Sequence, residues 1–294
     1  METIESLRKQ IDSAEDLQSV VKTMKGIAAV SIRQYERAVE SLRGYSEVVE
    51  RGFQLIAKQR PEVLRTSTQA GTGSLAAVVF GSDQGMCGSF NRDAAEHASR
   101  HSNKYGARER ERVFLPVGIR AYTELENLGR QPEPPQSLPN SVEGLTPAVQ
   151  RVLFTIEQWR AERGVSQVLL HYNRARRGAS YRPHTVQLLP LSPDWLAELA
   201  RRAWPTNHLP AHPGDWQTLF TVLVREYIFL ALFRAFAESM AAENASRLAA
   251  MHAAENNIEE KIDDLLGRYH QRRQAAITEE LLDVISGFEA LETK

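Results

Sequence analysis

The stretch Glu238–Leu291, ESMAAENASRLAAMHAAENNIEEKIDDLLGRYHQRRQAAITEELLDVISGFEAL, decides the fold, because no proline interrupts it. The proline-free region begins at Asp215, which follows Pro213-Gly214 and is the predicted N-cap. Apolar residues recur in it mainly at helical spacing: Leu248, Met251, Ile258, Ile262, Leu265, Tyr269, Ile277, Leu281, Val284, Ile285 and Phe288. This spacing predicts one long helix over 215–294 with a single narrow apolar stripe.

The other end of the chain has the same pattern. From Thr3 to about Lys58 there is no proline, and the apolar residues are again three or four positions apart: Ile4, Leu7, Ile11, Ala14, Leu17, Val21, Met24, Ala28, Ile32, Tyr35, Val39 and Leu42. The predicted helix over 1–60 would end before Pro61. About 55 helical residues would be about 80 Å long at about 1.5 Å per residue. So long a helix needs a partner along its length. The two stripes bury each other most economically in an antiparallel coiled coil.

The middle of the chain alternates between strands and helices. Short apolar runs predict strands at 75–80, 113–117, 166–172 and 181–189, and helical segments lie between them at 90–105, 119–128 and 146–163. The predicted fold is therefore a long antiparallel two-helix coiled coil from the two ends, with a Rossmann-like α/β domain inserted between them. The predicted domains are 1–60, 70–195 and 215–294, with a proline-rich linker at 196–214.

Composition narrows the function classes. The chain has 294 residues, 42% of them hydrophobic, which is enough for a sizeable core. A formal net charge of -1 argues against a nucleic-acid binder, because counterion release needs a basic surface. The single cysteine excludes an internal disulfide framework, and no apolar run approaches the roughly 20 residues that span a bilayer. We expect a soluble chain that reaches a membrane only through partners.

One loop offers an alternative enzymatic function. Gly81–Asn91, GSDQGMCGSFN, follows a predicted strand and enters a predicted helix, where backbone N–H groups could bind an anion. It lacks the GK[ST] of a phosphate-binding P-loop, so nucleotide binding is not favoured. A Rossmann-like hydrolase or transferase using this loop, with Cys87 as nucleophile, is the enzyme alternative. A buried structural thiol is the favoured prediction for Cys87.

A second pattern raises the question of a metal site. His97 and His101 stand four residues apart on a predicted helix, the spacing of a two-histidine metal face. Neither an intervening glutamate of the HExxH kind nor a cysteine cluster accompanies them. The prediction is a solvated helix surface, with no metal, no cofactor and no catalytic residues in the chain.

The C-terminal stretch resembles the gamma subunit of F-type ATP synthases, whose chains end in the pattern SExxxRMxAMxxAxxNxxxxIxxLxxxYNxxRQAxITxEixEIvsGaxAL. The matching residues include Glu243, Arg247, Ala250, Met251, Asn257, Ile262, Leu265, Tyr269, Arg273, Gln274, Ala275, Ile277, Thr278, Glu280, Ile285 and Gly287. Ile11–Ala29 and Ser82–Asn91 resemble two further motifs of that family, IxSvxxTxxITKAMkMVAA and SDRGLCGGfN. Gly26 stands where the family usually has an apolar residue, which indicates a divergent branch such as an alternative bacterial F-type ATPase.

The resemblance implies a non-catalytic central rotor stalk. Its partners would be a hexameric ring of alpha and beta subunits, the epsilon subunit and the membrane c-ring, at the cytoplasmic face of a bacterial inner membrane. By position in the motifs, Arg273, Gln274 and Thr278 would contact a beta-subunit catch loop. Met24, Lys25 and Arg247 would lie at neighbouring contacts between stalk and ring. A coiled-coil scaffold or chaperone-like clamp without a rotary partner is the second alternative.

Overall fold

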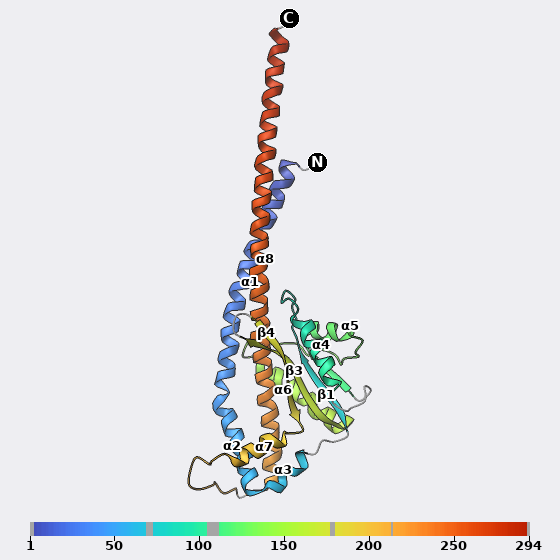
Figure 1. Cartoon of the computed structure of the whole chain (residues 1–294), viewed down its shortest axis with the longest axis vertical. Helices are drawn as coiled ribbons and strands as arrows, with labels where there is room; N and C mark the ends of the chain where they lie inside the picture. The colour runs from blue at the N-terminus through green and yellow to red at the C-terminus, as the bar shows by residue number, and fades with distance from the viewer. Residues whose placement is uncertain (1–2, 69–72, 105–111, 177–179, 213, 293–294) are drawn as a thin grey trace. The chain divides into compact units, whose positions relative to one another are not determined.

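The computed structural model describes residues 3–68, 73–104, 112–176, 180–212 and 214–292, which form two compact units (Figure 1). The smaller unit joins the two ends of the chain, Met1–Ile27 and Leu248–Lys294, and the larger unit is Ala28–Arg247. The predicted domain boundaries instead placed each terminal helix in a domain of its own, 1–60 and 215–294. Parts of both helices pack in the same core as the sheet, so the compact units cut across them.

The two long helices are α1 (Ile4–Ser41) and α8 (Trp216–Glu292). The predicted cap of α8 is confirmed, because the Asp215 carboxylate accepts hydrogen bonds from the backbone N–H of Gln217 at 3.3 Å and of Thr218 at 2.8 Å. The prediction of one continuous helix over 1–60 is wrong. After α1 come α2 (Arg43–Gln59) and α3 (Pro61–Thr68), and Pro61 opens α3 because its missing N–H costs nothing in a first turn.

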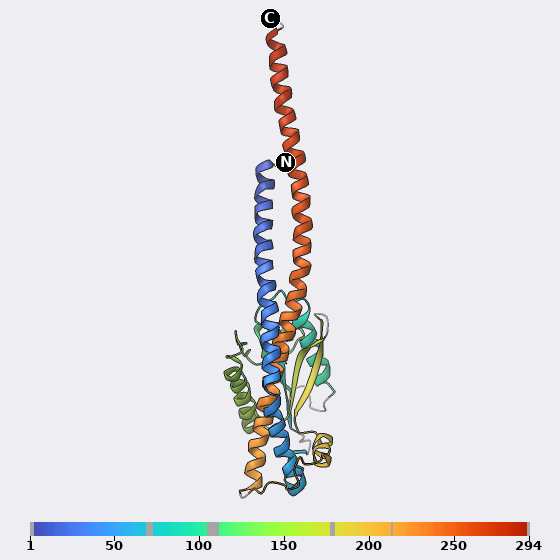
Figure 2. The same ribbon diagram turned by 90° about the vertical axis from the view of Figure 1, so that its left-hand side faces the viewer.

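In the smaller unit, α1 and α8 run antiparallel, as predicted (Figure 2). Leu7 of α1 is buried against Leu265 of α8. Further along, Lys25 of α1 forms an ion pair with Glu255 of α8. Rising residue numbers in α1 thus meet falling numbers in α8. One apolar cluster of this unit consists of Leu7, Ile11, Leu265 and the partly buried Tyr269.

The larger unit contains a four-stranded sheet in the order β2-β1-β3-β4. Its strands are β1 (Ser74–Phe80), β2 (Arg112–Val117), β3 (Val165–Arg176) and β4 (Ser180–Leu189). β1 is parallel to β2 and β3, and β3 pairs antiparallel with β4. The helices α4 (Phe90–Ser102), α5 (Ile119–Asn127) and α6 (Leu145–Arg163) lie between the strands along the chain. The predicted α/β sheet and its four strands are confirmed.

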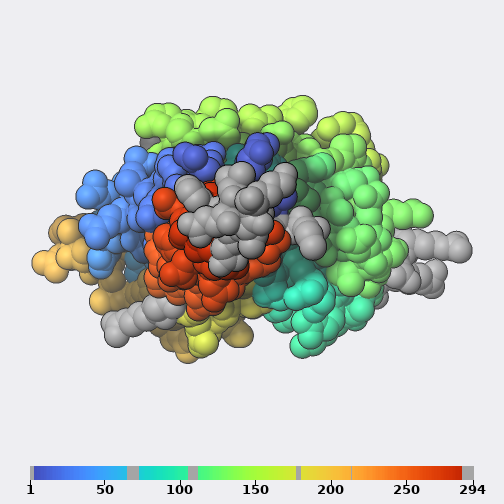
Figure 3. Space-filling view, turned by 90° about the horizontal axis from the view of Figure 1, so that it is seen from above, coloured from blue at the N-terminus to red at the C-terminus, as the bar shows by residue number. Residues whose placement is uncertain are grey.

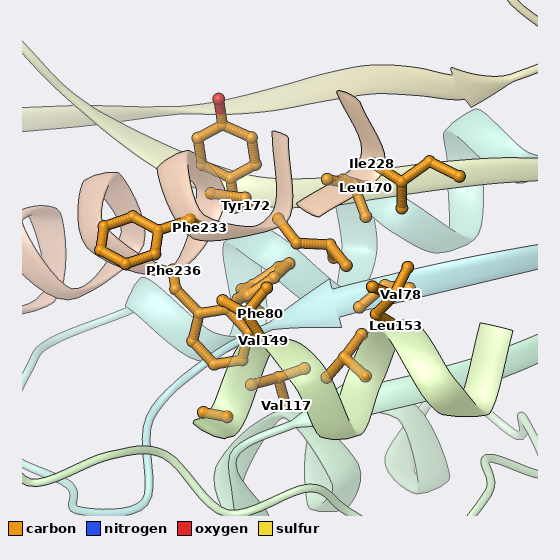
Figure 4. Packing of buried hydrophobic residues seen from close by; sticks show 14 of the residues in the cluster. Val78, Phe80, Val117, Val149, Leu153, Leu170, Tyr172, Ile228, Phe233 and Phe236 are labelled. Carbon is orange, nitrogen blue, oxygen red and sulfur yellow. The ribbon is translucent and has the colours of Figure 1, made fainter. Parts of the chain in front are cut away.

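The two faces of the sheet bury different helices, because successive side chains of a strand point to opposite sides. Val78 and Phe80 of β1 pack with α6 and α8 (Figure 4). Ala77 and Val79 pack with α4 and α5 on the other face. The atoms of α4 (teal) and α6 (yellow-green) accordingly lie on opposite sides of the larger unit (Figure 3). Phe236 of α8 meets Phe80 edge-on, with 4.9 Å between ring centroids. The sheet therefore holds part of α8 directly in its core.

The predicted linker over 196–214 is partly wrong, since α7 (Pro193–Arg201) forms a helix at its start. Ser192 caps α7, and Pro193 occupies its first turn. Leu196 and Leu199 are buried in a second apolar cluster with Phe53 of α2. This burial, which is not apparent in a proline-rich segment, stabilises the short helix.

Among the described residues, no helix combines the length and the apolar character that crossing a membrane would require.

Replacing Gly26 with alanine is expected to stabilise the chain by about 0.5–1 kcal/mol, because glycine inside a helix costs that much relative to alanine. Gly26 is exposed on α1, and a Cβ built there meets nothing within 4 Å. Urea unfolding followed by far-UV circular dichroism measures the gain. The matched control is Gly52→Ala, where the added Cβ would lie 2.5 Å from Leu223 Cδ2 and should reduce stability. A loss of stability in Gly26→Ala would contradict the expectation.

Candidate functional site

The end of α8 exposes large apolar side chains. Leu265 is 2% exposed beneath Leu7, but Ile277, Leu281, Leu282, Val284 and Ile285 are all between 48% and 58% exposed. A contiguous apolar surface of this kind marks a site of interaction with another macromolecule. The predicted site residues Arg273, Gln274 and Thr278 lie on the same stretch and are exposed. The Thr278 hydroxyl donates to the backbone carbonyl of Gln274 at 2.9 Å, and this is a bond within the helix.

The two predicted site residues on α1 are less accessible. Met24 and Lys25 are both half-buried. Lys25 donates to the Glu255 carboxylate, and this hydrogen bond holds the pKa of Glu255 below its ordinary value. Lys25 therefore has a partner within its own chain, where it helps to hold α1 to α8. Its contact with another subunit stays a prediction, as does that of Met24.

Arg247, also predicted to contact a partner, is buried in the larger unit with 8% of its surface exposed. Its Nη2 lies 2.6 Å from a Glu243 carboxylate oxygen, one helical turn earlier on α8. The same nitrogen donates to the backbone carbonyls of Gln84 and Gly85, each at 3.4 Å. The structure thus brings Arg247 together with the 81–91 loop, a contact that sequence reasoning missed.

Glu243 is the buried acid of this arrangement. Burial raises the pKa of the Glu243 carboxyl, Arg247 acts against that rise by its charge and hydrogen bond, and the Asp83 charge adds to it. The pairing of Glu243 with Arg247 could be predicted from the sequence, because an acid and a base four residues apart share a helix face. Its burial was not visible there, since the carbonyls that complete the site come from a distant loop.

Polar groups of the 81–91 loop are hydrogen-bonded both within the loop and to α8. The Asn91 side chain accepts from the backbone N–H of Ser82 at 2.8 Å, and the Ser246 hydroxyl of α8 donates to the Cys87 carbonyl at 2.7 Å. Cys87 is 2% exposed, and burial raises the pKa of its thiol above the ordinary value, which disfavours the thiolate. The prediction of a buried structural thiol is confirmed.

The prediction that His97 and His101 form a solvated surface is wrong, because both side chains are half-buried. His97 Nε2 lies 2.8 Å from the Thr185 hydroxyl of β4. The fully buried His171 of β3 lies beside both rings, and it was missed because it stands inside an apolar run that reads only as a strand. Among the described residues, no group of three or more His, Cys, Asp or Glu is arranged to hold a metal ion.

Comparison with known proteins places these features in context. A family model described as ATP synthase matches residues 3–291. The ATP synthase gamma chain of Geotalea uraniireducens (strain Rf4) is 27% identical over 295 residues, and 99% of each chain is covered. That of Salinibacter ruber (strain DSM 13855 / M31) is 30% identical over 309 residues, again with 99% of each chain covered.

Solved structures share the fold. A chain of the Euglena gracilis mitochondrial ATP synthase, in its OSCP/F1/c-ring structure, has a TM-score of 0.65 at 19% identity, with 98% of this chain and 94% of that chain covered. A chain from the central stalk and c-ring of the Tetrahymena thermophila mitochondrial ATP synthase has a TM-score of 0.56 at 22% identity, with 80% and 99% covered.

Proposed function

Since the chain belongs to the ATP synthase gamma-chain family, we propose that it is the central rotor stalk of a bacterial F-type ATP synthase. The observation that carries the proposal is the exposed apolar end of α8, in a chain whose two ends pair as antiparallel helices. A helix end with this surface suits insertion into a surrounding protein ring. The ring would consist of alternating alpha and beta subunits.

The mechanism follows from an asymmetric stalk in a pseudo-symmetric ring. As the stalk turns, it presents different faces to the three beta subunits and so favours a different conformation in each one. This is allostery by differential contact, because a partner shifts an equilibrium only by its unequal interaction with the two states. The chain itself supplies no catalytic group to this mechanism, and it acts by coupling ion flow in the membrane sector to the catalytic sites.

The larger unit supports such coupling. There α8 is fastened to the sheet by Phe236 and to the 81–91 loop by Ser246 and Arg247, so a torque on the sheet domain reaches this part of α8. The epsilon subunit and the membrane c-ring would be the partners that apply it. The stalk would stand at the cytoplasmic face of the bacterial inner membrane and reach the bilayer only through these partners. Gly26 stands where the family usually has an apolar residue, which favours a divergent bacterial branch of the family.

The two alternative functions are less well supported. An enzyme using the 81–91 loop would need a free nucleophile and free donors, but Cys87 is buried and the Ser82 N–H is bound by Asn91. A scaffold or clamp without a rotary partner would not account for a family match over residues 3–291.

Assembly with the ring is the direct test of the proposal. We would co-express the chain with alpha and beta subunits, separate the products by gel filtration and assay ATPase activity of the eluted complex. One copy of the chain in an active hexameric ring is the expected result. A monodisperse chain that does not bind the ring would overturn the proposal while leaving the fold intact.

Replacing Gln274 and Thr278 together with alanine is expected to lower the coupled ATPase activity about tenfold with folding unchanged. Both side chains are exposed, so their loss should cost binding to a partner and little stability. Two contacts worth about 1.4 kcal/mol in total correspond to a tenfold effect. The measurement is ATPase turnover of the reconstituted complex, with circular dichroism of the free chain.

The matched control is Gln150→Ala with Thr155→Ala on α6. Thr155 donates to the carbonyl of Arg151 at 3.0 Å, which is the same bond within a helix turn that Thr278 makes. This control should retain wild-type turnover. Wild-type turnover in the assembled Gln274 and Thr278 variant would remove these two residues from the proposed contact.

A further inference from the structure

Three histidine rings meet between α4 and the sheet of the larger unit. His97 and His101 of α4 stack with their ring centroids 5.2 Å apart. The ring of His171, on β3, lies 5.9 Å from His97 and 6.1 Å from His101. His171 is fully buried and His97 is half-buried. We refer to His97, His101 and His171 as the histidine cluster.

Hydrogen bonds tie the histidine cluster to both strands of the β3–β4 hairpin. The Thr185 hydroxyl of β4 lies 2.8 Å from His97 Nε2 and 2.9 Å from His171 Nδ1. A hydroxyl has one proton, so it donates to one of these rings and accepts from the other. The ring that accepts must be neutral at that nitrogen. On its other side, His171 Nε2 lies 3.5 Å from the Ser102 hydroxyl at the end of α4.

The charges around the cluster oppose its protonation. Those that act most on the rings, among the described residues, are Arg100 and Lys104 at the end of α4, His184 on β4, and the rings themselves. All are cationic when charged. Near α5, Arg130 binds Ser99 of α4 and is cationic too.

The two carboxylates of α4 are engaged elsewhere. Asp93 accepts from the Tyr181 hydroxyl at 2.7 Å, and Glu96 lies 3.7 Å from Arg100 in an ion pair. Among the residues that the structure describes, the charges that act most on the three rings therefore include no carboxylate that would compensate an added proton.

In this environment the folded state favours the neutral form of the three histidine rings. Burial lowers the pKa of His171 to about 3, and burial also lowers the pKa values of His97 and His101. A histidine whose folded pKa is depressed contributes full stability above its unfolded pKa of about 6.5. That contribution is lost as the pH falls from about 6.5 toward the folded value.

We propose that the histidine cluster is an acid-sensitive clamp, which fastens α4 to the β3–β4 hairpin when neutral and releases it when protonated. The loop 81–91 leads directly into α4 and is bound to α8 by Ser246 and Arg247. Acidification would therefore loosen the element that connects the sheet domain to α8 in the larger unit. The clamp follows from the cluster alone and does not depend on the proposed rotor function.

Hydrogen–deuterium exchange of the full-length chain tests the clamp. Exchange rates of α4 peptides are divided by the intrinsic rates at about pH 7.5 and about pH 5.5, with α6 peptides as an internal reference. One proton taken up on opening changes the opening equilibrium up to tenfold per pH unit, so His171 alone predicts about a tenfold rise over this range. His171→Gln should remove most of the pH dependence. The matched control His208→Gln, at an exposed loop position, should retain the wild-type profile.

A second variant keeps the test decisive if His171→Gln does not fold. His97→Gln keeps a hydrogen-bonding side chain at a half-buried position and should also weaken the pH dependence. The clamp is overturned if α4 opens equally at both pH values in the wild type, or if α6 opens in step with α4. It is also overturned if a folded His97→Gln or His171→Gln variant keeps the full pH dependence. Protection of α4 by added Zn²⁺ at about pH 7.5 would replace the clamp with a metal site.

Discussion

Replacing Arg247 with methionine is expected to destabilise the chain by about 3–5 kcal/mol, because the Glu243 carboxylate would remain buried without its partner. Glu243 is 6% exposed and lies 2.6 Å from the Arg247 guanidinium. The same substitution removes the donor to the carbonyls of Gln84 and Gly85. Urea unfolding at about pH 8 measures the loss.

The pH dependence of this loss has a defined sign. A carboxyl whose folded pKa is raised contributes stability that is present below its unfolded pKa and is lost as the pH rises through the folded value. Burial raises the pKa of Glu243, and removing Arg247 takes away the opposing influence. The difference in unfolding free energy between Arg247→Met and wild type should therefore shrink as the pH falls from about 8 to about 5. A difference that is constant or grows would show that the buried charge is not its cause.

Two further variants separate the buried pair from a surface effect. Glu243→Gln added to Arg247→Met removes the unpaired charge and should recover a large part of the stability. Arg225→Met breaks an exposed ion pair, in which Arg225 and Glu157 are 3.1 Å apart, and should cost at most about 1 kcal/mol. The folded double variant can also be assembled with the ring. If it assembles but has low ATPase turnover, Arg247 contributes to turnover beyond its role in stability, which supports the predicted partner contact.

Elements with a regular apolar period were predictable from the sequence, because the period follows from local geometry. The strand that ends at Phe80 and the helix that ends at Arg163 were both expected within one residue of their observed bounds. The break at Leu42 was not, since the same stripe continues through it. The helix α7 was hidden because its stabilising contacts, such as Leu196 with Phe53, come from a distant part of the chain.

The candidate sites show the same division between local and distant information. Gln274 is exposed near the end of α8, and the family motif alone suggested it as a contact residue. The setting of Arg247 depends on a loop 163 positions away, at Gln84, so the sequence suggested a surface contact where the structure shows a buried one. His171 likewise gains its importance only when the fold brings His97 beside it.

Replacing Phe236 with alanine is expected to destabilise the larger unit by about 3–5 kcal/mol, because it opens a cavity in the main core. Phe236 is fully buried on α8 and meets the ring of Phe80 at an interplanar angle of 88°. The edge-to-face arrangement adds about 0.5–1.5 kcal/mol to the effect of buried area. Phe236→Leu fills most of the cavity and should lower the unfolding free energy by less than Phe236→Ala does. The difference between the two variants then measures the contribution of packing.

Phe154→Ala on α6 is the matched control, since Phe154 is 67% exposed and its loss should change the unfolding free energy by less than about 0.5 kcal/mol. Equal losses at Phe154 and Phe236 would contradict the packing of α8 against the sheet. Because Phe236 joins α8 to β1, a folded Phe236→Leu variant should also lower coupled turnover in the assembled complex more than Phe154→Ala does. Stability and torque transfer would then depend on the same contact, as expected if the sheet domain drives α8 through its core.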